Sequence, residues 1–166
     1  VPLINVTDIY QDFRVQPEKL DLVPASEKEY EKFSAKPNDV IFNRSSLVKS
    51  GIGYATLVPE SHEKSVFECH LMRVRPNPKL LFGPYLARFA LSAYGRRFFL
   101  SRAQTTTMTT INQGDLNAFV VPCPSLSVQK EISSQLDAIE KSSLMQKERF
   151  NHLKKIKKQL LNIALG

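Results

Sequence analysis

The segment VPCPSLSVQKEISSQLDAIE, residues 121–140, marks the place where the character of the chain changes. Pro122 and Pro124 interrupt regular structure, because proline lacks the amide hydrogen that helices and central strands need. Beyond Pro124 the sequence has no further proline and no glycine before its last residue. Ser127 belongs to the residue types favoured at a helix N-cap. We therefore predict a single helix over about residues 128–165, with a length of about 57 Å at the usual rise per residue.

An apolar stripe with a gap in its middle runs along this predicted helix. Alternating steps of four and three residues from Ile132 give ten positions up to Ala164, and seven of them are apolar. This pattern is typical of a coiled-coil seam. A domain of about 126 residues cannot bury so long a stripe, so we expect a partner helix from another chain or from a second half of this one. A helix folded back on its own domain is the alternative. The predicted helix-pairing residues are Ile132, Leu136, Ile139, Phe150, Leu153 and Leu160.

The residues before the helix predict a mixed domain of the α/β (α+β) class over residues 1–126, with residues 127–166 as the helical region. Alternating residues favour a short strand from Pro2 to Tyr10, and a strand at 40–42 follows a Pro-Asn-Asp turn. We also expect a strand pair at 54–58 and 66–74, joined by a polar turn at 59–64. Pro84 opens a predicted helix with Leu86, Phe89, Ala90 and Ala93 on its inner face, which Gly95 interrupts. A capping box of Asn112 and Asp115 and an apolar strand at 118–121 complete the predicted elements.

Composition allows a hydrophobic core and gives no sign of a membrane protein. Hydrophobic residues make up 42% of the chain, but no apolar run approaches the ~20 residues of a membrane span. The N-terminus lacks the basic start and apolar core of a signal peptide, and the absence of an initiator Met is consistent with a fragment. Cys69 and Cys123 leave a disulfide open, but two thiols in a chain of this size favour a reducing compartment, so we expect the cytoplasm.

Positive charge is concentrated in the later parts of the chain. The net charge is +7. Residues 1–39 contribute −3, residues 40–126 contribute +6 and residues 127–166 contribute +4. A basic surface of this kind suits a polyanion, of which nucleic acid is the commonest. Simple solubility is the alternative explanation.

A search for catalytic motifs finds none. The chain has no Walker-type Gly-Lys loop, no Asn/Asp-Pro-Pro-aromatic tetrapeptide of the kind found in base methyltransferases, and no Glu-x-Lys tripeptide of the nuclease type. Gly51-Ile52-Gly53 is better explained as a turn than as part of a dinucleotide site. Cys69-His70 and Cys123 lack the paired spacing of zinc ligands, so we expect no metal. The sequence therefore predicts a binding protein that is not an enzyme and has no cofactor of its own.

Basic, amide and hydroxyl side chains form the candidate DNA-binding set. Arginine and lysine neutralise phosphates, which makes affinity salt-dependent. Arginine also pairs with guanine, and glutamine or asparagine pairs with adenine. Threonine hydroxyls bond phosphates, and the threonine methyl contacts the methyl of thymine. The predicted DNA-binding residues are Arg44, Ser45, Ser46, Lys49, Arg96, Arg97, Arg102, Gln104, Thr105, Thr106, Thr107, Thr109 and Asn112. The alternative for the threonine-rich run is a strand with one packed face and one wet face.

Several motifs together carry a resemblance to a known family. They are PLINVTDIY at the start, PNDVIF followed by Arg44, GIGYA, and the run TTTMTTINQGDLNAFVVPCPSLSVQKEISSQLDAIE before a helix that ends QLLNIALG. Over essentially its whole length the chain resembles a target recognition domain and the adjoining helical region of the specificity subunit of type I restriction–modification systems. Val128 is a small departure, because family members usually have an acidic residue before the equivalent of Gln129.

The resemblance implies a sequence-specific DNA recognition module that binds one half of a bipartite double-stranded target. It implies no catalysis in this chain. The partners that it implies are the modification (methyltransferase) subunits, which the helices would also dock, the restriction subunit, and a second copy or second half of the specificity subunit. S-adenosylmethionine, Mg and ATP would be used by those partners. Base recognition would fall to variable loops, such as Arg44–Lys49 and Ser61–Lys64. A non-catalytic adaptor that pairs through its helix without binding DNA is the alternative.

Overall fold

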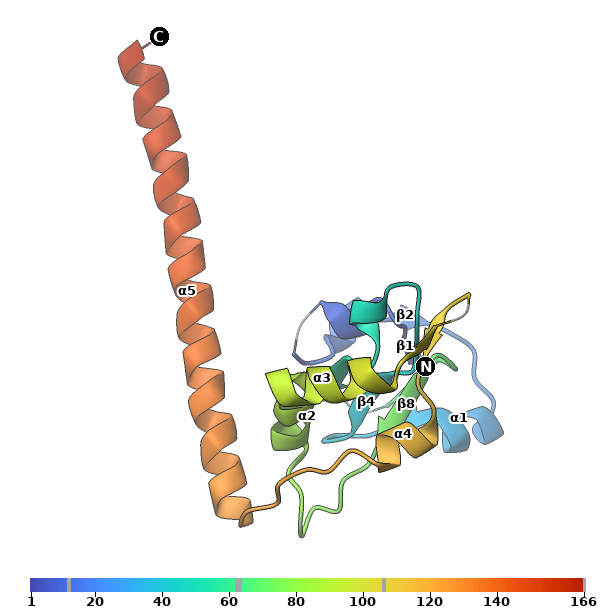
Figure 1. Ribbon diagram of the computed structural model, residues 1–166. Coiled ribbons are helices and arrows are strands. Elements are labelled where there is room, and N and C mark those ends of the chain that lie inside the picture. Colours follow the sequence, from blue (N-terminus) through green and yellow to red (C-terminus); the bar gives the residue numbers. More distant parts are fainter. Residues whose placement is uncertain (12, 62–63, 106, 166) are drawn as a thin grey trace. The chain divides into compact units, whose positions relative to one another are not determined.

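The computed structural model describes residues 1–11, 13–61, 64–105 and 107–165, and the side chains of residues 163–165 are not described. The chain divides into two compact units, Val1–Lys130 and Glu131–Gly166. Among the described residues, the strands and four short α-helices lie in the first unit, and most of one long helix forms the second (Figure 1). In the part of the chain that the structure describes, no helix is both long and apolar enough to cross a membrane.

A central antiparallel sheet has the order β6-β4-β8. It is built from β4 (Val40–Asn43), β6 (Ala55–Leu57) and β8 (Leu71–Val74), and Val40 lies opposite both Leu57 and Val74. The middle strand follows a turn in which Asn38 has a positive φ of 68°. The predicted strand at 40–42 is therefore confirmed. All four residues of β4 are buried, as expected of a strand that is covered on both faces.

A second sheet has the order β2-β1-β7-β3. Its strands are β1 (Pro2–Ile4), β2 (Asp21–Leu22), β3 (Ser34–Ala35) and β7 (Ser65–Phe67), of which β1 and β7 run parallel. The predicted pairing of 54–58 with 66–74 is wrong, because β4 lies between β6 and β8 and because 66–74 contains two strands of different sheets. The predicted strand from Pro2 to Tyr10 ends at Ile4, and its last residues form the 3-10 helix η1 (Asp8–Tyr10). The polar turn predicted at 59–64 lies partly outside the described residues, which exclude 62 and 63.

Two hydrophobic clusters lie on opposite faces of β4, because neighbouring side chains of a strand point in opposite directions. Phe42 packs in one cluster with Leu86 and Phe99. Ile41 packs in the other cluster with Ile4 and other residues of the second sheet. The first cluster is covered by α2 (Gly83–Leu91) and α3 (Ala93–Arg102), which Figure 1 shows over the central sheet.

The helix predicted from Pro84 consists of two helices separated at Ser92. Leu86 and Ala90 are buried as predicted, but Ala93 is exposed. The side chain of Ser92 accepts a hydrogen bond from the amide of Gly95 and so caps α3. Gly95 lies within α3 and does not break the helix. A Cβ at this position would lie 2.3 Å from the carbonyl oxygen of Ala90, so glycine allows the two helices to meet.

Among the remaining helices, two predictions are confirmed: the capping box at 112–115 and the long C-terminal helix. They are α1 (Glu27–Phe33), α4 (Gln113–Asn117), α5 (Leu126–Leu165), and the 3-10 helices η2 (Pro17–Lys19) and η3 (Lys49–Gly51). The capping box of Asn112 and Asp115 is confirmed at α4. The predicted long helix is confirmed, but it begins at Leu126, so Ser127 lies inside it and is not its N-cap.

The apolar segment at 118–121 is not a strand. It runs as irregular chain from α4 toward α5 and packs Phe119 against a group of aromatic rings from α2 and α3. The centroids of Phe119 and Phe99 lie 4.8 Å apart. Apolar residues here close the core through ring contacts, which need no strand partner.

Candidate nucleic-acid interface

A third, small sheet carries most of the predicted hydroxyl groups. Its order is β5-β10-β9, formed by β5 (Ser45–Ser46), β9 (Gln104–Thr105) and β10 (Thr109–Thr110). Thr109 lies opposite both Ser46 and Thr105, while Thr110 lies opposite both Ser45 and Gln104. The threonine-rich run therefore forms a hairpin, drawn in yellow in Figure 1, which joins the loop after β4 to the end of α3. Threonine suits this extended backbone because its branched side chain favours strands.

The hydroxyl groups of this sheet divide between a packed side and a wet side. Ser45, Ser46 and Thr109 are buried, with exposed fractions of 8%, 7% and 3%. The Ser46 Oγ accepts a hydrogen bond from the amide of Val48, and the Thr105 and Thr109 hydroxyls lie 3.2 Å apart. Gln104, Thr105, Thr107 and Thr110 are exposed, whereas Thr106 lies outside the described residues. The alternative interpretation, a single strand over the run with one packed and one wet face, holds only for the two residues of β10, because the run contains two strands and both residues of β9 are exposed.

Basic side chains surround this sheet without acidic neighbours in the sequence. All charged residues from Val40 to Pro59, and all from Cys69 to Gly114, are Lys or Arg. Arg44 and Lys49 are exposed on either side of β5 and its loop, and Arg97 is exposed on α3. Arg102 is also exposed, and its Nη1 lies 3.8 Å from a carboxylate oxygen of Asp115. The arrangement can therefore neutralise several phosphates at once.

Arg96, which belongs to the predicted DNA-binding set, makes contacts within the protein. Its Nη2 donates a hydrogen bond of 2.7 Å to the carbonyl of Ser50, and its guanidinium lies 5.8 Å from the centroid of the Tyr54 ring. Burial lowers the pKa of Arg96 from its ordinary value, and Tyr10 and Tyr54 oppose this shift. Arg96 thus braces the loop that carries Lys49, and a contact between Arg96 and DNA stays a prediction.

Asn112 is likewise occupied within the fold. Its Oδ1 accepts a hydrogen bond of 3.0 Å from the amide of Asp115, and the Asp115 carboxylate accepts one of 2.9 Å from the Asn112 amide. These two bonds satisfy amides at the start of α4 that have no partner within the helix. The side chain is exposed, so the predicted contact of Asn112 with DNA also stays a prediction.

The loop between β5 and η3 contains two exposed apolar residues that the sequence did not single out. Leu47 is 84% exposed and Val48 is 62% exposed. The signal was present in the sequence, because these two apolar residues stand between serines and Lys49 in a loop already predicted to be functional. The exposed residues Arg44 and Lys49 stand on either side of this apolar pair in the sequence.

A cleft with basic side chains lies beside the same surface. It has a volume of about 600 Å³. Its floor includes Phe33 and Phe67, whose rings meet edge to face with centroids 5.8 Å apart. The side chains of Lys32, Arg44 and Arg73 line it, and Gln113 and Asn117 add amide groups from α4. Lys32 and Arg73 also lie over the Phe33 and Phe67 rings, at 5.1 and 5.6 Å from the centroids.

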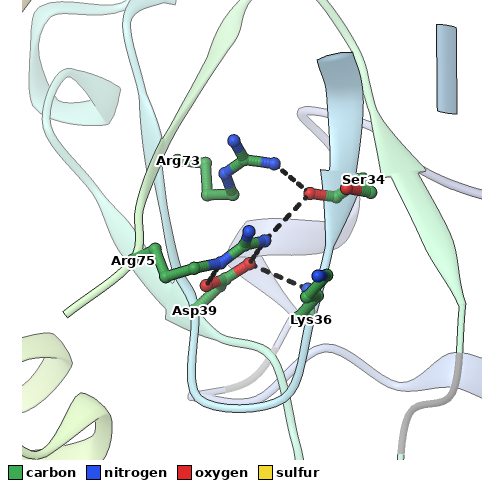
Figure 2. A network of polar contacts seen from close by, with 5 residues as sticks. All are labelled: Ser34, Lys36, Asp39, Arg73 and Arg75. Carbon is green, nitrogen blue, oxygen red and sulfur yellow. Dashed lines mark hydrogen bonds and ion pairs between the residues drawn. The ribbon is translucent and has the colours of Figure 1, made fainter. Parts of the chain in front are cut away.

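A network of polar contacts fixes Arg73 and its neighbour Arg75 (Figure 2). The carboxylate of Asp39, which is 1% exposed, accepts hydrogen bonds from Nε and Nη2 of Arg75 at 2.8 and 2.7 Å. It also accepts one from the Lys36 amide, and both guanidinium groups donate to the carbonyl of Ser34. The bond to Asp39 raises the pKa of Arg75, whereas burial lowers that of Arg73. Because Arg75 is paired, it adds less to an anion site than Arg44 does.

The predicted helix-pairing residues are all exposed on α5. Ile132 and Leu136 are each 37% exposed, and Ile139, Phe150, Leu153 and Leu160 are between 54% and 65% exposed. The same helix exposes Leu144, Met145, Ile156 and Leu161. This extent of exposed apolar side chain is unusual for a helix that works alone in water.

Metal ligands do not gather in the described residues. No group of three or more His, Cys, Asp or Glu side chains there is placed to hold a metal ion. Both cysteines, Cys69 and Cys123, are exposed free thiols.

An α/β domain with a basic, hydroxyl-bearing surface and a long helix with an unpaired apolar face is the arrangement that the family resemblance implies. The model of the type I restriction modification DNA specificity domain matches residues 1–155, and the chain therefore belongs to this family. It is 29% identical over 171 aligned residues to the type I restriction enzyme EcoKI specificity subunit of Escherichia coli strain K12, and 27% identical to the StySPI specificity subunit of Salmonella potsdam. Both alignments cover the whole chain but 35% of the relative, so the chain spans about a third of their length.

Two solved structures share the fold. One comes from a study of complex assembly and conformational transition of the type I R-M system; it has a TM-score of 0.67 and 21% identity, and the match covers 99% of this chain and 38% of the other. The other is the HsdS subunit from Thermoanaerobacter tengcongensis, with a TM-score of 0.61, 18% identity, and coverage of 90% of this chain and 32% of that one. These matches confirm the predicted fold class of a mixed α/β domain followed by a long helix.

Proposed function

We propose that this chain is a sequence-specific DNA recognition module that binds one half of a bipartite target for a type I restriction–modification system. The observation that carries the proposal is the family match over residues 1–155. The surface around β5, β9 and β10 supports it, because its charged groups are almost all basic and its exposed hydroxyl and amide groups suit phosphates and base edges.

The chain would act without catalysis of its own. The reactions would be carried out by two partner subunits. A methyltransferase subunit would use S-adenosylmethionine, and a restriction subunit would use Mg and ATP. We place this assembly in the cytoplasm, where its DNA substrate lies.

The long helix would hold this module at a fixed distance from a second one. At 40 residues, α5 has a length of about 60 Å, which exceeds one duplex turn of about 34 Å. Its exposed apolar side chains would pack on the helix of a second copy or of a second half of the subunit, and on the modification subunits. Two half-sites separated by an unread spacer follow from such a geometry.

A selection from random duplexes tests DNA recognition directly. The full chain is incubated with a randomised duplex pool at moderate salt, and the bound fraction is sequenced. We expect a single short motif to be enriched, with affinity that falls as salt rises. Retention without any enriched motif would contradict sequence-specific recognition and would favour the adaptor interpretation.

Methylation in cells tests the assignment to a restriction–modification system. The adenine methylome is compared between cells that carry the gene and cells from which it is deleted. We expect one bipartite motif to lose methylation on deletion, with one half matching the motif selected in vitro. An unchanged methylome in cells that express the chain would contradict the proposed partnership with a methyltransferase.

A further inference from the structure

We propose that Leu47 and Val48 form an apolar tip that contacts thymine methyl groups in the major groove and thereby helps to determine the target sequence. This inference rests on the proposed function, because it needs a DNA duplex on the surface around β5. It goes beyond that function by naming the residues and the chemical group that they recognise.

The first support is exposure. Leu47 and Val48 follow β5 directly, and they expose 84% and 62% of their surface. Ser46, directly before the tip, and Gly51, three residues after it, are both buried, so the tip projects from a loop whose two ends are packed. Exposed apolar side chains gain free energy when a partner removes them from water.

The second support is a set of hydrogen bonds that fixes the first half of this loop. The Asn43 Oδ1 accepts a bond of 2.9 Å from the Ser45 amide, and the Ser46 Oγ accepts one of 3.2 Å from the Val48 amide. Ser46 is also paired in register with Thr109 of β10. The backbone on which Leu47 and Val48 stand is therefore held before any ligand binds.

The second half of the loop is fixed from other elements. The hydroxyl of Tyr10 in η1 donates a hydrogen bond of 3.0 Å to the carbonyl of Gly51, and the side-chain Nδ2 of Asn43 donates to the same hydroxyl. Arg96 of α3 donates to the carbonyl of Ser50 at 2.7 Å. A loop braced at both ends loses little conformational entropy on binding, as recognition of a defined sequence requires.

The third support is the charge around the tip. Arg44 precedes it and Lys49 follows it, and both are exposed. Acidic residues are absent from the sequence between Val40 and Pro59. A polyanion is thus the matching partner, and DNA presents phosphates beside apolar groups on one surface.

The apolar group that duplex DNA offers to such a tip is the methyl group of thymine in the major groove. An apolar wedge between base steps in the minor groove is a different use of similar residues. We favour the major groove because Gln104 and Thr105, which are exposed on β9 in the same sheet as β5, suit its hydrogen-bonding base edges.

The test uses four matched variants of the full chain: L47S and V48S at the tip, and L22S and V120S as controls. Leu22 is 78% exposed and Val120 is 72% exposed, so the controls remove comparable exposed side chains elsewhere. Each variant is first checked by circular dichroism for wild-type melting. The target motif is selected from random duplexes, and affinity for motif and scrambled duplexes is measured against salt.

We expect L47S or V48S to lower the ratio of specific to non-specific affinity about tenfold, as loss of one base contact does. The slope of log affinity against log salt should stay unchanged, because no phosphate contact is lost. The controls should behave as wild type. Tip variants with the wild-type ratio would overturn the proposal while leaving DNA recognition intact, whereas a wild-type chain that selects no motif would overturn both.

Replacing thymine by uracil at each position of the selected motif then tests the methyl group itself. We expect the wild-type chain to lose affinity for one or two substituted duplexes, and the corresponding tip variant to be insensitive to the same substitution. Equal sensitivity of wild type and tip variants, or a wild type that tolerates uracil throughout, would overturn the contact with thymine methyl groups.

Discussion

Gln129 shows how much one buried amide can fix. It is fully buried, its Oε1 accepts a hydrogen bond of 2.8 Å from the Phe82 amide, and its Nε2 donates to the carbonyls of Leu80 and Pro124 at 2.9 and 2.8 Å. The first turns of α5 are thereby tied to the chain segment that leads into α2. An amide is suited to this place because it donates and accepts at once.

We expect Gln129→Ala to lower the free energy of unfolding by about 1–3 kcal/mol, because it removes three hydrogen bonds to partly buried backbone groups. Gln129→Glu should cost more, because a carboxylate would face the carbonyl oxygens of Leu80 and Pro124. Urea unfolding followed by circular dichroism measures both. Gln135→Ala is the matched control, since Gln135 is exposed on the same helix, and a loss from Gln129→Ala no larger than the control's would contradict this role.

At the scale of single residues, hydrogen bonds between residues close in sequence were easier to predict than the burial of a side chain. The capping box at Asn112 followed from the spacing of two residues, because both partners lie within one turn. The burial of Ser45, Ser46 and Thr109 did not follow, because strands of two residues are too short for an alternating pattern to be recognised. Two of the partners of Gln129, Phe82 and Leu80, lie 47 and 49 residues away, which no local pattern predicts.

Short helices near the surface depend on their caps. At the start of α1, the Glu29 carboxylate accepts hydrogen bonds from the amide and hydroxyl of Ser26 at 2.9 and 2.7 Å. These bonds lower the pKa of Glu29, with the backbone bond as the larger cause. A lowered pKa in the folded state means that the cap contributes stability above the unfolded pKa, which is about 4.3, and loses it as pH falls through the folded value.

We therefore expect the Ser26 amide of the native chain to become less protected from hydrogen exchange as the pH falls through the lowered pKa of Glu29. The carboxyl titration of Glu29, followed by NMR, should have a midpoint below the ordinary glutamate value. Glu29→Gln should keep the acceptor and remove this pH dependence. A Glu29 midpoint at or above the ordinary value would contradict the cap as the cause.

The long helix is the element with the clearest need for a partner. We expect the wild-type chain to self-associate in sedimentation velocity at tens of micromolar, because the stripe of α5 is exposed. Leu136→Lys or Leu153→Lys should shift it to the monomer mass, since a charge in a helix seam is costly to bury. Ser134→Lys, on the opposite face, should leave association intact. A wild-type chain that stays monomeric at these concentrations would contradict pairing between copies.

Elements differed in how far the sequence predicted them. The long helix was predicted because forty residues without proline or internal glycine, with a helical apolar period, permit little else. The pairing of 54–58 with 66–74 was wrong because apolar strands carry no mark of their neighbours, and here β4 took the central position. The helix break fell at Ser92 and not at Gly95, because a serine cap ended one helix and began another.

At the scale of the whole molecule, charge would decide the strength of the proposed DNA binding and its response to salt. We expect Arg44→Ala and Lys49→Ala each to weaken binding to every duplex and to reduce the slope of log affinity against log salt by about one. Fluorescence anisotropy at several salt concentrations measures this slope. Lys19→Ala is the control, since Lys19 is exposed on η2 in the acidic N-terminal part of the chain. An unchanged slope in both variants would remove these residues from the phosphate contacts.

The braced loop also has a meaning for how such a protein acquires new targets. Its residues 47–50 stand between Ser46, which pairs with Thr109 of β10, and Gly51, whose carbonyl accepts a hydrogen bond from Tyr10 of η1. Asn43 of β4 and Arg96 of α3 bond backbone groups of Ser45 and Ser50. The residues that hold the loop are thus different from the side chains that the loop exposes. Substitutions at the exposed loop positions, natural or engineered, would therefore change the side chains offered to DNA and leave the surrounding scaffold intact.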